Sequence, residues 1–461
     1  MTRKDVLWGY LAQALNIGAG LILLPVILKY LPAAEVGLWF VFITLVGLAQ
    51  LLEFGFNPTI SRNTSYIYAG AVALQRDGLP IHDTNKSTIN LDLLASLLNT
   101  ARKVYRVVSL LAAALLLIGG SIYISTLVTE ETSDKTTLIL AWVTFATGYI
   151  VTLYYGYING MLHGRGDVSQ SNKIIITTRG LLILLGSYAL ITGHGLLGLG
   201  IASLMSSGIG RIIAMRYFFS ETRPEMRTIR SLATNTADDL TPLLWHNASR
   251  LGAVQVGSFL IQRGNILIAS STLGLESAAS YGMTVTILTV LITVSSVLCQ
   301  LQLPRLNAIQ SRNERSSLIT IYGQIQLSSW TVFSLGLIFL VVFGDLMLNF
   351  VGSDTKLIPW PLLLVFGLIY LFELNHSIAA TYLTTVNKIP FVKAALISGI
   401  SITVLAVFLS AAYGIVGLIA AQGVVQLAYN NWKWPMEAQK NLQSSFLGTI
   451  KVGFKQFIGK I

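Results

Sequence analysis

The sequence predicts an all-α polytopic membrane protein of about twelve spans in two pseudo-symmetric six-helix lobes, followed by a C-terminal amphipathic helix. Of its 461 residues, 53% are hydrophobic and only 11% are charged, whereas about 25% of the residues of a soluble domain are charged. Apolar segments of about twenty residues, the length that crosses a bilayer core, recur along the whole chain. A similar segment also ends each half of the chain, which indicates an internal repeat.

The length of each apolar segment sets the expected boundaries of the spans. The first span begins within the basic start MTRKDVLWGY and continues through Leu28, which makes it longer than the core of a signal peptide. The predicted spans are 7–30, 37–57, 104–127, 137–159, 174–193, 195–219, 244–271, 277–301, 318–343, 357–385, 391–412 and 414–431.

The charges of the connecting segments predict the orientation of the chain. If the N-terminus is cytoplasmic, most of the 31 basic residues fall in cytoplasmic segments, among them Arg211 and Arg223 near the end of the sixth span. Only three lysines, at positions 29, 135 and 356, then face the outside. Because cytoplasmic loops are rich in Lys and Arg, this asymmetry supports the number of spans and places both termini in the cytoplasm.

The composition also argues against several classes of function. The basic residues are spread thinly and form no stripe with interleaved aromatics, so nucleic-acid binding is not expected. The only cysteine, Cys299, cannot form a disulfide within the chain, and no cluster of Cys or His predicts a metal site. External connections such as 192–195 and 411–414 are too short to hold a catalytic domain, so we expect a protein that is not an enzyme.

The internal repeat is clearest where each half ends. HGLLGLGIA at His194–Ala202 matches YGIVGLIAA at Tyr413–Ala421, so that the first two glycines of each copy correspond. Tyr30–Trp39 and Thr272–Gly282 match more weakly, and chance similarity between glycine-rich apolar segments is the alternative. The repeat divides the chain into an N-terminal lobe 1–220, a cytoplasmic linker 221–243, a C-terminal lobe 244–431 and a basic tail 432–461.

The tail carries apolar residues at helical spacing, with lysines elsewhere. Phe446, Ile450, Phe454 and Ile458 would share one side of a helix. This pattern predicts an amphipathic helix on the anionic inner leaflet, and a further helix docked on the lobe is the alternative.

The span 244–271 carries two arginines, which are costly inside a bilayer. Arg250 and Arg263 would each cost about 2.5–3.5 kcal/mol near the centre of a membrane helix, so such residues usually face a protein interior or a wet cavity. In a continuous helix they lie roughly 20 Å apart and point about 140° away from each other. Gln255 and Gln262 fall between them and extend the polar arc, as expected of a tall cavity. Alternatively, the guanidinium of Arg250 lies at the level of the lipid headgroups, with the aliphatic part of its side chain in the apolar region.

Two acidic positions are candidates for ion coupling. Glu373 and His376 lie three residues apart on one face of the tenth span. They could carry a coupling proton or cation, form a static hydrogen-bonded pair, or partner Arg263 across the lobes. Glu53, at the cytoplasmic end of the second span, is expected to brace the turn at Pro58 rather than to bind ions, and it is the third candidate.

Two long segments resemble a known family. Pro25–Arg62 and Asn265–Gly282, with the repeated units of basic turn, span and GxxG, resemble the polysaccharide and O-antigen flippases of the multidrug/oligosaccharidyl-lipid/polysaccharide (MOP) exporter superfamily. The positions that match in the first segment are Pro25, Leu31, Glu53, Gly55, Pro58 and Arg62, with Pro32 in place of a usual glycine. Many relatives have fourteen spans, whereas this chain is expected to have twelve and a tail.

The resemblance implies a V-shaped central cavity between the lobes and alternating access. The implied substrate is an undecaprenyl-pyrophosphate-linked oligosaccharide repeat unit, of the O-antigen, capsule or exopolysaccharide type, moved from the cytoplasmic to the outer leaflet of the bacterial inner membrane. No organic cofactor is implied, although Na⁺ or H⁺ could drive the transport. Expected partners are membrane lipids and other polysaccharide-assembly proteins.

The predicted cavity residues suit such a substrate. Arginine presents a rigid donor fork that matches phosphate geometry, and amide side chains hydrogen-bond sugars. Intramembrane amides also join helices to one another, which is the alternative for Gln13 and Asn16. The predicted substrate-binding set is Arg250, Arg263, Gln255, Gln262, Asn265, Gln13, Asn16 and Arg62.

Three other functions compete with the flippase reading. A multidrug or small-cation exporter of the same superfamily would be expected to have acidic cavity residues. A membrane glycan polymerase would be expected to have a large outer loop or an acidic motif facing the leaflet. A scaffold that only recruits other assembly proteins would keep its role without any cavity arginine.

Overall fold

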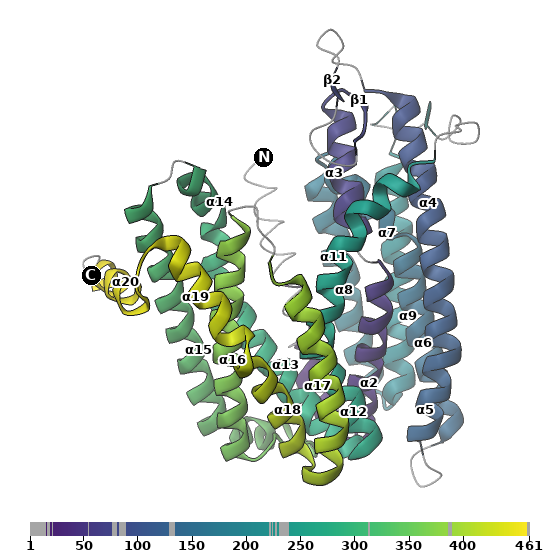
Figure 1. Ribbon diagram of the computed structural model, residues 1–461. Coiled ribbons are helices and arrows are strands. Elements are labelled where there is room, and N and C mark those ends of the chain that lie inside the picture. Colours follow the sequence, from purple (N-terminus) through teal and green to yellow (C-terminus); the bar gives the residue numbers. More distant parts are fainter. Residues whose placement is uncertain are drawn as a thin grey trace. The chain divides into compact units, whose positions relative to one another are not determined.

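The computed structural model describes residues 15, 19–20, 22–53, 55–75, 81–82, 89–128, 134–220, 223, 225, 228–229, 239–311, 314–385 and 390–458. These residues are helical almost throughout (Figure 1). Within them, nine segments are long and apolar enough to cross a membrane. The prediction of an all-α, multi-pass membrane protein is therefore confirmed.

The chain divides into two compact units, Met1–Gln255 and Val256–Ile461. The division falls inside a helix of the seventh predicted span. The start of that helix belongs to the first unit, because the ring of Trp245 packs 5.9 Å from that of Phe56 and the backbone N–H of Leu240 donates to Oγ1 of Thr100.

The first unit contains membrane-spanning helices, several short helices and one pair of short strands. Its elements are α2 (Ala33–Gln50), η1 (Leu51–Glu53), α3 (Phe56–Tyr68), β1 (Ala71–Ala73), β2 (Ile81–His82), α4 (Leu91–Ala113), η2 (Ala114–Gly120), α5 (Ser121–Leu127), α6 (Lys135–Tyr154), α7 (Gly156–Gly164), α8 (Val168–Ile191), α9 (Gly195–Phe218) and the start of α11 (Thr241–Gln262). The α6 and α8 helices both pack along α9. Of the first predicted span, residues 22–30 are helical and most of the remainder lies outside the described residues.

The connection predicted between the second and third spans contains more structure than expected. It holds α3, the antiparallel pair of β1 and β2, and the first turns of α4. The third span itself runs without a break through α4, η2 and α5, and its centre widens into a π-helix at η2. The indole Nε1–H of Trp142 donates to the carbonyl of Leu116 at 3.1 Å, and this bond stabilises a carbonyl of the widened turn.

The second unit continues with longer helices. Its elements are the end of α11, α12 (Gly264–Thr272), α13 (Leu275–Ser295), α14 (Val297–Ser311), α15 (Arg315–Val351), α16 (Trp360–Thr384), α17 (Val392–Tyr413), α18 (Ile415–Ala428), α19 (Asn430–Leu442) and α20 (Phe446–Ile458). The α15 and α16 helices pack together, and α17 packs along both α12 and α18.

The two copies of the repeat adopt the same local structure. Gly195 opens α9 with φ 52°, and Gly414 precedes α18 with φ 58°. Positive φ is accessible to glycine at little cost, so each glycine makes the tight turn between two antiparallel helices. At the next glycine of each copy, a Cβ atom would clash: at Gly198 with Ala189 at 2.6 Å, and at Gly417 with the carbonyl of Leu409. Both hairpins therefore depend on glycine in the same two places.

The tail forms two helices that pack on the second unit. This agrees with the alternative prediction of a docked helix, and not with a helix held only by lipid. The α19 helix packs along α16 and buries Trp434 and Leu442. The α20 helix packs along α15, where a Cβ atom on Gly453 would lie 2.5 Å from the backbone of Gly323. The predicted apolar stripe explains only part of this contact, because small residues make the closest approach and Phe454 stays 53% exposed.

Candidate functional site

The seventh predicted span is broken at Arg263 rather than continuous. The α11 helix ends at Gln262 and α12 begins at Gly264, with Arg263 between them at φ −125° and ψ −21°. The break is local, because the backbone N–H of Arg263 still donates to the carbonyl of Phe259 at 2.8 Å and its carbonyl accepts from Ile266 at 3.0 Å. The helix is therefore continuous from Arg250 to Arg263, and the change of direction comes after Arg263.

One side of α11 packs tightly, and another side is open. A Cβ atom on Gly257 would lie 2.6 Å from the backbone of Ala395, so α11 contacts α17 there without space between them. Gln255 and Gln262 are exposed and lie about two turns apart on a different side of the helix. Arg263 is half-buried, and its position is about 80° around the helix from Gln255 and about 100° from Gln262. Because amide side chains are poorly tolerated against lipid, this arrangement is typical of a helix that faces water.

The remaining predicted cavity residues are placed differently. Asn265 is 1% exposed, and its Nδ2 donates to the hydroxyl of Tyr281 at 3.3 Å, so in this conformation it joins α12 to α13. Arg62 is exposed on α3. Gln13, Asn16 and the side chain of Arg250 lie outside the described residues. The substrate-binding role of the whole set stays a prediction.

Glu373 lies in a buried polar network of the second unit. It is 8% exposed, and its Oε1 accepts a 3.1 Å hydrogen bond from Nε2 of Gln426 on α18. Gln426 accepts in turn from Nδ2 of Asn430, which also donates to Oγ of Ser398 at 2.8 Å. The other carboxylate oxygen, Oε2, is buried with no hydrogen-bond partner among the described residues. A buried oxygen in this state is costly unless it binds a proton or a cation.

Other polar groups around Glu373 also lack well-formed hydrogen bonds. Nδ1 of His376 is buried without a hydrogen-bond partner in the described structure. The hydroxyl of Tyr370 and the amide of Gln422, also buried, lie near each other without a well-formed hydrogen bond. Glu373 and His376 therefore do not form the static hydrogen-bonded pair that was one alternative. Such a concentration of unsatisfied polar atoms in one place needs an explanation, and an unrecorded ion or water is one.

Tyr370 lies one turn before Glu373 on α16. As a neutral phenol it carries no charge that could pair with an arginine or a carboxylate. No ion pair joins Arg263 to a carboxylate in the described residues, so a direct pair of Arg263 with Glu373 is not observed.

The first unit holds a second charged group, Arg211. It lies within α9, about two turns before the end of that helix. Its Nη1 is buried without a hydrogen-bond partner among the described residues, and the guanidinium interacts electrostatically with the carboxylate of Glu53. The hydroxyl of Tyr105 donates to Oε1 of Glu53 at 2.5 Å. Glu53 thus bonds to α4, so its main contact is not with the turn at Pro58.

The signal for Arg211 was present in the sequence. Its position falls inside the predicted span 195–219, although the charge count assigned it to the cytoplasm together with its basic neighbours. An intramembrane arginine is by default a candidate for function. Arg211 therefore joins Arg263 as a candidate, each within its own unit.

Two comparisons returned no relative: no family model matches the chain, and no curated protein matches it. Solved structures do match. The inward-facing conformation of a multidrug resistance MATE family transporter of the MOP superfamily matches with a TM-score of 0.65 and 12% identity, over 96% of this chain and 99% of that one. The outward-facing conformation of a transporter so described matches with a TM-score of 0.57 and 13% identity, over 95% and 94% of the two chains.

A third similar structure is a MOP superfamily transporter from Pyrococcus furiosus, described as having a binding pocket of reverse polarity that suggests a different function. It matches with a TM-score of 0.51 and 13% identity, over 96% of this chain and 95% of that one. At these identities the likeness concerns the fold and extends over nearly the whole chain. The chain is thus a multi-pass membrane protein with the fold of the MOP-superfamily transporters.

Proposed function

We propose that this protein is a flippase that moves undecaprenyl-pyrophosphate-linked oligosaccharide repeat units from the cytoplasmic to the outer leaflet of a bacterial inner membrane. The observation that carries the proposal is Arg263. It lies at a break in the seventh predicted span, whose helix also exposes Gln255 and Gln262, and no carboxylate in the described residues forms an ion pair with it. A guanidinium without an ion pair, in a helix that also carries amides, suits a pyrophosphate joined to sugars.

The reverse polarity described for the binding pocket of the similar Pyrococcus furiosus transporter supports a basic binding site in this chain. It shows that one MOP fold carries binding pockets of different polarity, and Arg211 and Arg263 make the two candidate positions of this chain basic. The fold itself occurs in both inward-facing and outward-facing conformations in the similar multidrug transporters. Alternating access is accordingly the expected means of transport.

Transport is coupled, in this proposal, to a proton or Na⁺ at Glu373. The free Oε2 of the carboxylate would take the ion. Coupling requires that the occupancy of this site and the affinity for the substrate each change the other, because the free energy of coupling between two sites is reciprocal.

A second candidate function, a multidrug or small-cation exporter, is favoured by the same carboxylate. Glu373 is a buried acidic group with a free oxygen, which is the feature that a cation exporter needs. The position of Glu373 inside a polar network, and not beside the exposed amides of α11, makes it better suited to a small ion than to a large organic cation.

Glycan analysis of cells that lack this protein separates the two functions. If the protein is the flippase, polyprenyl-linked glycans of one complete repeat unit accumulate, and mass spectrometry of the extracted lipids detects them. Supplying Arg263→Ala leaves the accumulation in place, while the exposed control Arg305→Ala removes it. Absence of accumulation together with greater sensitivity to cationic compounds would transfer the assignment to the exporter.

A further inference from the structure

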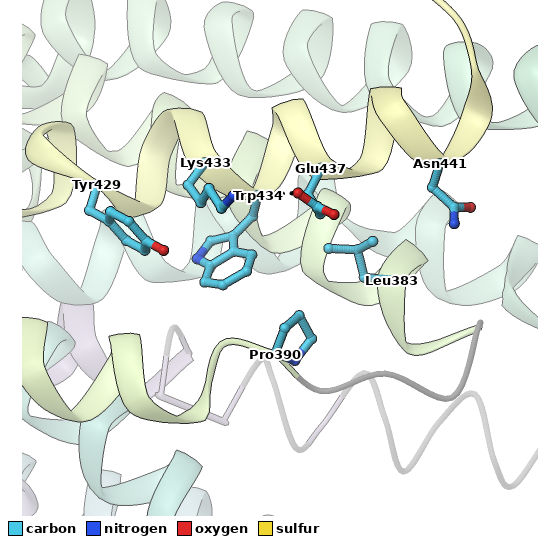
Figure 2. Close-up of a pocket in the computed structure, with 7 residues that line it drawn as sticks. All are labelled: Leu383, Pro390, Tyr429, Lys433, Trp434, Glu437 and Asn441. Carbon is cyan, nitrogen blue, oxygen red and sulfur yellow. Dashed lines mark hydrogen bonds and ion pairs between the residues drawn. The ribbon is translucent and has the colours of Figure 1, made fainter.

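A cavity of about 340 Å³ lies where α19 crosses the end of α16 and the turn before α17, and Figure 2 shows the side chains that line it. It adjoins the polar network of Glu373, because Nε1–H of its Trp434 donates to Oδ1 of Asn430 at 2.9 Å. Its lining is Leu383, Pro390, Tyr429, Lys433, Trp434, Glu437 and Asn441. Every one of these residues belongs to the second unit.

The cavity lies at the level of a membrane surface. Leu383 is at the C-terminal end of the membrane span α16, and Pro390 directly precedes the membrane span α17. Trp432 and Met436, on the same helix as the cavity, are 46% and 50% exposed. Trp and Tyr are enriched where a protein crosses the boundary between lipid and water. A lipid headgroup is therefore the molecule that meets this cavity in the native membrane.

The cavity holds one basic side chain, Lys433, and one acidic side chain, Glu437. Nζ of Lys433 lies 3.4 Å from Oε2 of Glu437, one turn further along α19, and the side chains remain 33% and 42% exposed. Neither group is enclosed by this contact, so each can take another partner. An anionic headgroup alone would have to compete with Glu437, and a cation alone with Lys433. A zwitterionic headgroup satisfies both, with its phosphate at Lys433 and its ammonium at Glu437.

The neutral lining also suits this headgroup. The rings of Tyr429 and Trp434, with centroids 5.9 Å apart, form an aromatic corner that favours a cation. The hydroxyl of Tyr382 donates to Oδ1 of Asn441 at 2.7 Å, which orients the amide and leaves its nitrogen as a donor for a phosphate or ester oxygen. Leu383 and Pro390 supply the apolar side on which acyl chains begin.

We propose that this cavity binds the headgroup of phosphatidylethanolamine. The primary ammonium donates hydrogen bonds to Glu437, the phosphate pairs with Lys433, and the bound lipid joins the ends of α16 and α17 to α19. The lipid bound here is distinct from the transported substrate.

The test counts lipids that remain bound when the full-length protein is released from detergent micelles in an intact-protein mass spectrometer. With phosphatidylethanolamine and phosphatidylglycerol present in equal amounts, the unmodified protein retains the former in preference. Glu437→Gln reduces retention of phosphatidylethanolamine about tenfold, because a charge-assisted hydrogen bond is lost, and raises retention of phosphatidylglycerol because Lys433 is no longer neutralised. Lys433→Gln reduces retention of both lipids.

The matched control is Lys440→Gln, which removes one exposed lysine of the same helix outside the cavity and leaves retention unchanged. Equal retention of phosphatidylethanolamine by Glu437→Gln, Lys433→Gln and the unmodified protein would overturn the proposal. Glycerophosphoethanolamine, which has no acyl chains, should fail to displace the lipid at equal concentration. Displacement by it would assign the cavity to a soluble headgroup compound and would equally overturn the lipid assignment.

Discussion

Gln426 donates a 3.1 Å hydrogen bond to Oε1 of Glu373 and leaves Oε2 of the same carboxylate buried without a partner. The bond fixes the orientation of the carboxylate from the neighbouring helix, while the free oxygen stays available. A carboxylate held in this way can gain and lose an ion without a change in its position.

Replacing Glu373 by Gln should abolish ion-driven transport and leave folding intact. The amide keeps the acceptor for Gln426 and the volume of the side chain, but it cannot take a proton or bind Na⁺ as a charge. We expect the rate of transport driven by an ion gradient in proteoliposomes to fall by more than about tenfold, since the change removes the coupling group itself. The exposed control Glu276→Gln should transport normally. Full gradient-driven transport by Glu373→Gln would exclude this carboxylate as the coupling site.

Arg211 should be required for transport beyond its effect on stability. Arg211→Ala removes the electrostatic partner of half-buried Glu53, so we expect a loss of about 1–3 kcal/mol in stability as well as a loss of transport. Adding Glu53→Gln should restore the unfolding temperature but not the transport. Recovery of both in the double variant would mean that Arg211 serves only to balance Glu53. Arg216→Ala, an exposed change on the same helix, is the control.

The two glycines near the break in the seventh span should respond oppositely to alanine. Gly257→Ala places a Cβ atom 2.6 Å from the backbone of Ala395 and should lower stability by about 1–3 kcal/mol. At Gly264 the nearest atom to a Cβ would be 3.8 Å away, so Gly264→Ala has space and favours helix by about 0.5–1 kcal/mol. Thermal unfolding in detergent measures both. A destabilised Gly264→Ala would show that the break needs glycine for its backbone.

Asp239 should contribute stability that depends on pH. A hydrogen bond from the Lys103 ammonium, with two from Thr241, lowers the pKa of the Asp239 carboxyl from 3.8 to about 2. Because the pKa is lowered in the folded state, the contribution is present above about pH 4 and is lost as the pH falls through about 2. The side chains of Lys103 and Asp239 are 65% and 49% exposed, so solvent limits the effect to about 1 kcal/mol or less.

Asp239→Asn measures this contribution directly. Its unfolding temperature should lie below that of the unmodified protein at pH 5, and the difference should shrink at pH 2.5. Asp354→Asn, which changes an exposed carboxylate in another connection, should show no such trend. A constant difference at both values of pH would mean that the ionised form of Asp239 does not stabilise the fold.

The membrane helices could be predicted from the sequence because length and hydropathy are local properties. The repeated hairpins could be predicted for the same reason, since Gly195 and Gly414 are fixed by the backbone of one turn. The docking of α20 could not, because the contact of Gly453 with Gly323 joins distant segments through small residues that leave no apolar pattern.

Only part of the candidate site could be predicted from the sequence. Arg263 and Glu373 stand out as charges in apolar spans, and the sequence indicates both. The break beside Arg263 was missed because α11 and α12 together have the length of one continuous span. Gln426 was missed because its contact with Glu373 depends on which helices are neighbours in space. Arg211 also stands out as a charge in an apolar span, but its interaction with Glu53 depends on the fold.

Translocation of a labelled undecaprenyl-pyrophosphate-linked oligosaccharide across proteoliposomes tests the central proposal most directly. The unmodified protein should move the labelled lipid to the opposite leaflet, where a membrane-impermeant quencher or glycosidase reaches it. Arg263→Ala should lower this rate by at least about tenfold with normal protein content, and Arg263→Lys should retain part of it because an ammonium keeps the charge without the fork. Equal translocation by the unmodified protein and Arg263→Ala would contradict the assignment of Arg263, and no translocation by the unmodified protein would contradict the flippase itself.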